Sequence, residues 1–252
     1  MSTTSVNTSV SASAQSETAD DIDIRGSARA VYYSHDPYDE IYYCYNIIDI
    51  FIHSGLHAKW PNKPKYIIDV YAIAEIKLPG AANIIIMAKN DRGRYHAEEN
   101  LINKLRRHLE STSPRGGRRP IVDVTVKIWI NFSPCYRCSR RILNFIEEMR
   151  RRNIYMSVEI VFPCLYRIRR NYCEDNCYPH QHNLPSQQDH DSNVKGLLNL
   201  KHDGGVFLKV FNDEEWRKLQ EVLRINYGVP ENRRLEDETL ELDFLRMIRP
   251  QS

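Results

Sequence analysis

Residues 122–132 carry the stretch VDVTVKIWINF, and this stretch decides the fold. Its side chains alternate between two faces, as they do along a β-strand. One face contains Val122, Val124, Val126, Ile128, Ile130 and Phe132, and Asp123, Thr125, Lys127 and Trp129 are among the residues opposite. Residues 135–150 then show helical spacing of apolar side chains, with a stripe that includes Ile142, Leu143, Phe145, Ile146 and Met149. A strand followed by an amphipathic helix predicts a helix packed on a sheet.

The alternation of helix and strand extends in both directions from this stretch. Upstream, we expect a helix at residues 39–57, a hairpin of strands at 64–78 and 82–89 around the turn signal Pro79-Gly80, and a helix at 95–109. Downstream, we expect a strand at 157–165, a long polar loop at 167–192, a short helix at 194–202, a strand at 206–211 and helices at 214–226 and 233–248. This order predicts an α/β layered domain with a five-stranded mixed sheet flanked by about six helices.

Length and composition indicate one domain with a tail. Residues 1–30 are small, polar and then acidic, which predicts a disordered tail, and residues 31–252 are expected to form the single domain. The sequence has no apolar run long enough for a membrane span, and residues 1–16 lack the apolar core of a secretory signal. We therefore expect a cytoplasmic or nuclear protein whose clustered thiols favour metal over disulfides.

Charge is distributed unevenly along the chain. Residues 24–170 contain 25 Lys and Arg against 14 Asp and Glu, a net charge of +11, although the whole chain has only +2. Residues 1–23 carry four acids and no Lys or Arg. A strongly positive region attracts phosphates, so a polyanionic partner fits this distribution, as does an ordinary solvated surface.

Two short motifs carry the chemistry: His96-Ala97-Glu98 and, further along, Pro134-Cys135-Tyr136-Arg137-Cys138. One His and two Cys supply three zinc ligands, which leaves a fourth position for water. Both motifs lie at predicted strand-to-helix junctions, and a helix N-terminus favours the thiolate that binds zinc. Glu98 is not needed as a ligand. Its carboxylate is suited to moving protons on and off the water.

This combination is the signature of zinc-dependent nucleobase deaminases, in which activated water attacks the ring carbon that bears the amine. For cytosine that carbon is C4, and Glu98 would protonate the ring nitrogen and the leaving ammonia. Alone, the Cys-x-x-Cys motif could be a redox pair or half of a structural zinc site, and the His-x-Glu motif is a weaker signal still. A structural site, however, normally has a fourth protein ligand.

The chain resembles the AID/APOBEC-like family of polynucleotide cytidine deaminases. The match consists of Ser133-Pro134-Cys135-Tyr136-Arg137-Cys138, of Leu165-Tyr166 after the following strand, and of residues 196–200 and 204–206 around the last strand. Phe132 stands where the family usually has Trp, which keeps an aromatic ring and removes an indole N–H. The resemblance covers roughly residues 40–248 and implies a cytidine-deaminase-like fold with one catalytic zinc ion.

The resemblance also implies a substrate and the residues that would contact it. The substrate would be single-stranded DNA or RNA whose target cytosine is flipped into the pocket and becomes uracil, in immunity or in programmed editing. Tyr166 would stack on the base, and Asn90 would orient the nucleotide. The residues expected at the substrate are Asn90, Phe132, Ser133, Tyr166, Arg167, Arg169 and Arg170.

A second cluster of metal-binding residue types lies in the predicted loop. It contains Cys173, Cys177, His180 and His182, which suffice for a structural zinc site. A disulfide or unpaired surface side chains are the alternatives.

Two other functions share parts of the pattern. Deaminases of free cytidine or of adenosine in tRNA use the same zinc motif. A catalytically silent nucleic-acid-binding protein could keep zinc for stability alone, but it would have no use for the carboxylate of Glu98. The charge distribution and the arginines after Tyr166 favour a polymeric substrate.

Overall fold

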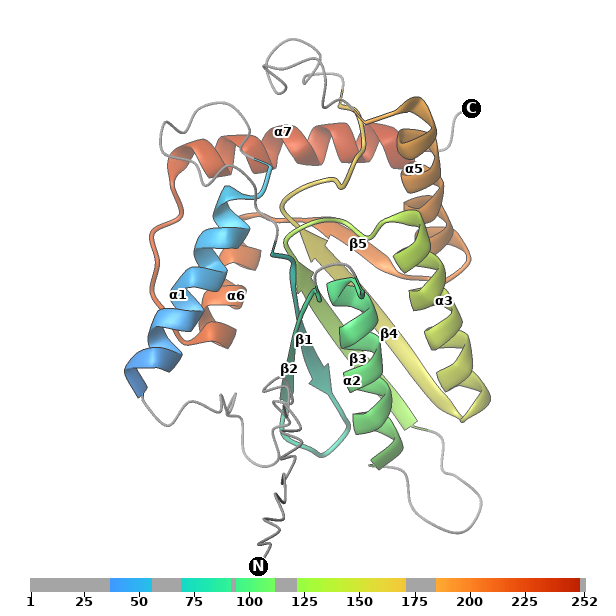
Figure 1. Cartoon of the computed structure of the whole chain (residues 1–252). Coiled ribbons are helices and arrows are strands. Elements are labelled where there is room, and N and C mark those ends of the chain that lie inside the picture. The colour runs from blue at the N-terminus through green and yellow to red at the C-terminus, as the bar shows by residue number, and fades with distance from the viewer. Residues whose placement is uncertain (1–36, 56–68, 92–93, 112–121, 171–184, 250–252) are drawn as a thin grey trace, which may run out of the picture.

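The computed structural model describes residues 37–55, 69–91, 94–111, 122–170 and 185–249. In this part of the chain, a five-stranded mixed sheet has helices on both faces, which confirms the predicted α/β class (Figure 1). The strands are β1 (Tyr71–Lys77), β2 (Ile84–Lys89), β3 (Val122–Ile130), β4 (Ile154–Phe162) and β5 (Phe207–Val210). The helices are α1 (Pro37–His53), α2 (Ala97–Ser111), α3 (Tyr136–Arg151), α5 (Gln187–His202), α6 (Asp213–Leu223) and α7 (Glu231–Ile248). The tail expected at residues 1–30 lies outside the described residues.

The strand order brings the carboxyl ends of three strands to one edge of the sheet. The order is β2-β1-β3-β4-β5, with β1 antiparallel to both β2 and β3 and with β3, β4 and β5 parallel. Tyr71, at the start of β1, pairs with Lys89 at the end of β2, and Ala72 pairs with Ile130 at the end of β3. The segments that follow β2, β3 and β4 therefore leave the sheet at the same edge, where α/β proteins commonly place their ligands.

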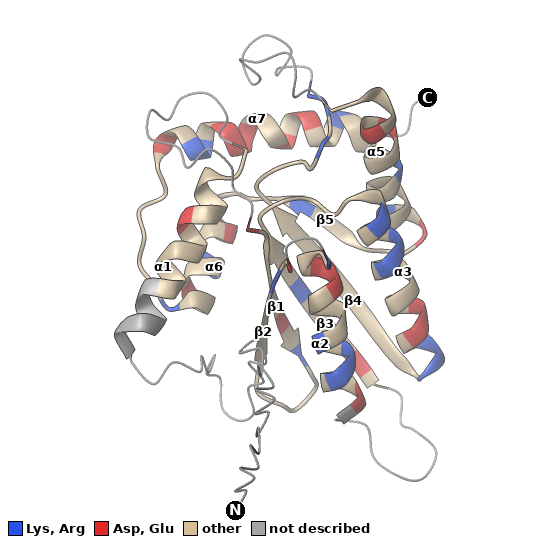
Figure 2. Cartoon of the chain, in the orientation of Figure 1, with Lys and Arg blue, Asp and Glu red and all other residues tan. Residues whose placement is uncertain are grey.

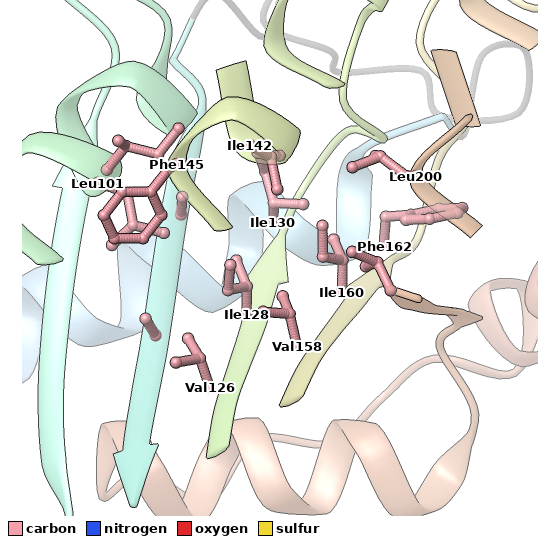
Figure 3. Packing of buried hydrophobic residues seen from close by; sticks show 14 of the residues in the cluster. Leu101, Val126, Ile128, Ile130, Ile142, Phe145, Val158, Ile160, Phe162 and Leu200 are labelled. Atoms are coloured by element: carbon pink, nitrogen blue, oxygen red, sulfur yellow. The ribbon is translucent and has the colours of Figure 1, made fainter. Parts of the chain in front are cut away.

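One face of the sheet packs against α2, α3, α5 and α7. Figure 3 shows Leu101 of α2, Phe145 of α3 and Leu200 of α5 in this cluster. Ile142, Phe145, Ile146 and Met149 of α3 follow helical spacing and are buried, as the sequence predicts. They pack in one cluster with the strand residues Val126, Ile128, Ile130, Val158 and Ile160. Each such side chain contributes about 1.5–3 kcal/mol through burial. This packing holds the first turn of α3 at the edge of the sheet where β3 ends.

The other face of the sheet packs against α1 and α6. Trp129 of β3 points to this face and is fully buried in the cluster with Phe51 of α1 and Trp216 of α6. Both faces of β3 are thus covered, which is why its side opposite the valines carries Trp129 as well as polar residues. Nearby, the buried carboxylate of Glu215 accepts hydrogen bonds from Lys127, Lys209 and Trp129.

The helix before β5 begins earlier than the sequence analysis expects. The loop was expected to continue to residue 192 and the helix to begin at 194, but α5 begins at Gln187. Its first turns contain Gln, Asp and His and show no apolar spacing, so hydrophobic periodicity misses them. A local signal was present. The side chain of Ser186 caps the helix by accepting a hydrogen bond from the backbone N–H of Asp189, three residues later.

Candidate metal centre and adjoining cavity

The two motifs that carry the candidate metal ligands meet at the edge of the sheet where β2 and β3 end. His96 directly precedes α2, and Cys135 is the residue before the first turn of α3, which contains Cys138. The hairpin brings the end of β2 beside β1, and β1 pairs with β3, so the two helices begin side by side. Their proximity follows from the sheet topology, because the two motifs are far apart in sequence.

His96, Cys135 and Cys138 form a group that can hold a metal ion. Their ligand atoms all lie within 4.8 Å of one another. The Nδ1 atom of His96 is 3.7 Å from the sulfur of Cys135 and 3.3 Å from that of Cys138. One imidazole and two thiols form a donor set that suits zinc, and the Cys-x-x-Cys spacing lets one helical turn present both sulfurs. In the described part of the chain this group has no fourth ligand residue.

The two thiols have opposite pKa shifts. A hydrogen bond from the side chain of Cys138, together with backbone N–H groups and His96, lowers the pKa of Cys135 to about 5. The same side-chain hydrogen bond, with burial and the nearby acids, raises the pKa of Cys138 far above its ordinary value. Both shifts arise from one hydrogen bond between the two side chains, so without metal the pair holds a proton between the two sulfurs. Binding a metal through both sulfurs releases this proton.

Glu98 lies beside this group in a cavity of about 240 Å³. The cavity is lined by Val70, Asn90, His96, Ala97, Glu98, Phe132, Ser133, Cys135 and Tyr166. Burial raises the pKa of Glu98 to about 7, although hydrogen bonds and His96 act in the opposite direction. A carboxyl group with this pKa can accept and donate a proton near neutral pH.

Two aromatic rings form part of the cavity wall. The ring centroids of Phe132 and Tyr166 are 6.4 Å apart and their planes meet at 79°. Ser133 holds the two segments together, because its N–H donates to the carbonyl of Cys164 at 2.8 Å and its hydroxyl accepts from the N–H of Tyr166 at 2.9 Å. Asn90 closes another side, where its Oδ1 accepts from the N–H of Val70 at 2.8 Å. Asn90 and Ser133, which the resemblance led us to expect at the substrate, thus line the cavity and also fix its walls.

Comparisons with known proteins do not assign this site. No protein-family model matches the chain. A search among characterised proteins finds no match either. The function is therefore inferred from the residues of the site and their arrangement.

The three arginines after β4 lie in different environments. Arg167 is 59% exposed, pairs with the exposed Asp189 at 3.6 Å, and has its guanidinium 5.7 Å from the centre of the Tyr166 ring. Arg169 is exposed, but its side chain donates to the carbonyl of Pro185 at 2.8 Å and to Gln187 at 3.2 Å. Arg170 is nearly buried in ion pairs with Glu236 and Asp243 of α7. Of the three, Arg167 has the position best suited to a phosphate, while Arg169 and Arg170 tie this segment to the rest of the fold.

Asn193 of α5 is a buried residue that sequence analysis missed. Its Oδ1 accepts a hydrogen bond from the N–H of Tyr136, at the start of α3, at 2.9 Å. Its Nδ2 donates to the carbonyl of Tyr166 at 3.2 Å. Asn193 thus connects the metal-binding helix with the aromatic wall. A single polar residue in a polar helical segment carries no sequence signal for such a role.

Two further expectations concern the second cluster of metal-binding residue types and the membrane. Cys173, Cys177, His180 and His182 lie outside the described residues, so the second zinc site stays a prediction. None of the helices in the described ranges has both the length and the apolar character that crossing a bilayer requires.

Proposed function

We propose that this protein is a zinc-dependent deaminase that converts cytosine to uracil in single-stranded DNA or RNA. The observation that carries the proposal is the placement of Nδ1 of His96 and the sulfurs of Cys135 and Cys138 within 4.8 Å of one another, with Glu98 lining the same cavity. Three ligands with a neighbouring carboxyl are typical of catalytic zinc, whereas a structural site normally has four ligands.

The residues of the cavity have distinct roles in this proposal. Bound zinc would supply a water activated as a nucleophile near neutral pH. Glu98 would take a proton from that water and deliver protons to N3 of cytosine and to the amine that leaves C4. It is buried away from bulk water and lines the cavity that the base would enter. His96, Cys135 and Cys138 would hold the ion.

The size and walls of the cavity fit a single pyrimidine. The cavity has a volume of about 240 Å³, which is large enough to admit cytosine with its eight non-hydrogen atoms. The Phe132 and Tyr166 rings offer apolar surface on which a flipped base can stack, a contact worth about 1–3 kcal/mol per base.

The charges around the cavity favour a polymer over a free nucleoside. Arg94, Arg137 and Arg167 are exposed, and each lies one or two residues from a residue of the cavity wall. Arg140, on the next turn of α3, is exposed as well. Figure 2 shows basic residues on the first turns of α3, whereas α7 carries many acidic residues. Exposed arginines beside a base pocket are placed to bind backbone phosphates, which a free nucleoside lacks.

The test compares wild type with Glu98→Gln on four substrates: cytosine-containing single-stranded DNA, the matching RNA, free cytidine and tRNA that contains adenosine. Glu98→Gln preserves the size of the side chain and removes its proton transfer. We expect uracil from DNA or RNA with wild type, loss of activity by at least about 100-fold in the variant, and unchanged zinc content. Product only from free cytidine or only from tRNA adenosine would show that the proposed polynucleotide cytosine substrate is wrong. Nucleic-acid binding and bound zinc without any product would indicate a silent binding protein.

A further inference from the structure

Glu99, the residue after Glu98, is buried and is not part of the cavity wall. It is 2% exposed. Its Oε2 accepts a hydrogen bond from the backbone N–H of His96 at 3.1 Å. Its Oε1 lies 2.9 Å from the guanidinium of Arg141 and 3.5 Å from that of Arg137. These contacts with Oε1 are ion pairs outside hydrogen-bonding geometry, so Oε1 accepts no hydrogen bond from the described residues.

The two sides of this contact are the two segments that carry the metal ligands. His96 is itself a ligand residue and precedes α2, while Arg137 lies between Cys135 and Cys138. Arg141 follows one turn later on α3. Glu99 therefore joins the start of α2 to the first two turns of α3 at the place where the ligands must meet.

Helix capping explains only half of this arrangement. A Glu three residues after the N-cap residue often accepts a hydrogen bond from the backbone N–H of that residue, as Glu99 does with His96. Capping requires neither burial of the carboxylate nor two arginines from another helix. Arg137 and Arg141 are 67% and 42% exposed, so these ion pairs are buried only at Glu99. What such pairing of a buried carboxylate adds is a defined relative position of the two segments.

We propose that Glu99 is a positioning residue of the metal site. Its carboxylate holds the N-terminus of α2 against that of α3, so that Nδ1 of His96 and both sulfurs reach a single ion. This inference rests on the metal site of the proposed function and concerns its assembly. Residues that orient metal ligands through such contacts commonly change metal affinity by about 10–100-fold when they are replaced.

The chain offers a matched control on the same pair of helices. Arg106 of α2 and Glu148 of α3 form an ion pair at 3.0 Å, far along both helices from the metal ligands. Arg106→Gln removes this bridge and leaves the metal site untouched. Glu99→Gln removes the charge that attracts Arg137 and Arg141 but keeps an oxygen that can accept from the N–H of His96.

The experiment measures zinc affinity of the full-length protein by competition with a chromophoric chelator. It also records the absorption spectrum of the Co²⁺ form, whose thiolate-to-metal bands report ligand geometry. We expect Glu99→Gln to weaken zinc binding about 10-fold or more and to alter the Co²⁺ bands. Arg106→Gln should match wild type in both measurements. Arg141→Gln, which removes a partner from the exposed side, should shift affinity in the same direction as Glu99→Gln and provides the test if Glu99→Gln does not fold.

Wild-type affinity and an unchanged spectrum in Glu99→Gln would overturn the proposal. So would equal losses in Glu99→Gln and Arg106→Gln, because they would reduce the role of Glu99 to general packing of α2 on α3. The proposed deaminase activity is judged separately, from wild-type turnover. A wild type that binds zinc but does not deaminate defeats the proposed function and leaves the Glu99 comparison valid. A wild type that binds no zinc overturns both.

Discussion

Replacing Arg233 should destabilise the protein more than any surface change, because this arginine is fully buried. Arg233 of α7 is 0% exposed. Its guanidinium donates to the carbonyls of Ser54 and Pro163 at 2.7 and 3.1 Å and to Oδ1 of Asp237 at 2.6 Å. Oδ2 of Asp237 accepts from the indole N–H of Trp216 at 2.7 Å. Arg233 therefore joins α7 to the ends of α1 and β4.

The expected cost of Arg233→Met follows from these contacts. Methionine keeps most of the apolar stem and removes the charge and the donors. Breaking a buried ion pair costs about 3–5 kcal/mol. The two carbonyls that lose their donors add about 1 kcal/mol each. The total of about 5–7 kcal/mol is a large part of the about 5–15 kcal/mol by which native proteins are stable.

The destabilisation by Arg233→Met should also depend on pH. Burial raises the pKa of Asp237 to about 6, even though Arg233 and Trp216 act to lower it. Removal of Arg233 raises this pKa further, so the carboxyl in the folded variant stays protonated to higher pH. A raised folded-state pKa gives stability that is present at low pH and lost as pH rises through that value. The gap between variant and wild type should therefore be larger at pH 8 than at pH 6, and it should stop changing below about 6.

Urea unfolding followed by tryptophan fluorescence measures both effects. With a slope of about 2 kcal/mol per molar urea, the midpoint should fall by roughly 2.5–3.5 M. The double variant Arg233→Met/Asp237→Asn should recover about 2 kcal/mol or more, because it no longer buries an unpaired carboxyl. Arg234→Met is the control, since Arg234 is exposed and pairs with exposed Asp213, and it should cost less than about 1 kcal/mol. A loss below about 1 kcal/mol for Arg233→Met would refute the assigned role of the buried ion pair.

Three further predictions concern charge and metal. Burial acts to raise the pKa of Glu215, but hydrogen bonds from Lys127 and Lys209 outweigh burial and leave this pKa below its ordinary value of 4.5. The ionised carboxylate therefore stabilises the fold above pH 4.5, and this stability is lost as the pH falls below that value. Unfolding free energies should therefore differ between wild type and Glu215→Gln at pH 7 and converge in acid; a constant difference would contradict this explanation. Arg167→Gln should reduce the salt dependence of single-strand binding by about one phosphate contact, measured by fluorescence anisotropy, and Arg169→Gln should not. Chelation at pH 7 should lower the melting temperature, because zinc at 100 times its Kd stabilises the folded state by about 2.7 kcal/mol, and an unchanged melting temperature would exclude a tightly held ion.

Much of the fold could be predicted because its main elements have regular apolar spacing. Val124 and Val126 are two residues apart on one face of β3, and Ile142 and Phe145 are three residues apart on one face of α3. All four are buried, so the spacing of apolar residues in the sequence matches the side of each element that packs in the core. The candidate metal ligands could be predicted from the sequence for a different reason. His96, Cys135 and Cys138 are residue types with few other uses in such spacing, and the structure brings them together.

The residues that sequence analysis missed act through contacts between distant segments. Asn193 bonds backbone groups of two other elements, and Glu99 attracts arginines of another helix. Neither contact leaves a periodic trace in the sequence. For the same reason, Arg169 and Arg170 could not be told from Arg167 before their partners were known.

Arg169 and Arg170 have a consequence for how this protein can diverge. Arg169 binds Pro185 and Gln187, and Arg170 binds Asp243 of α7, so the described residues on both sides of positions 171–184 are held to the rest of the fold. Substitutions between residues 170 and 185 can therefore accumulate while the wall of the cavity at Tyr166 keeps its position.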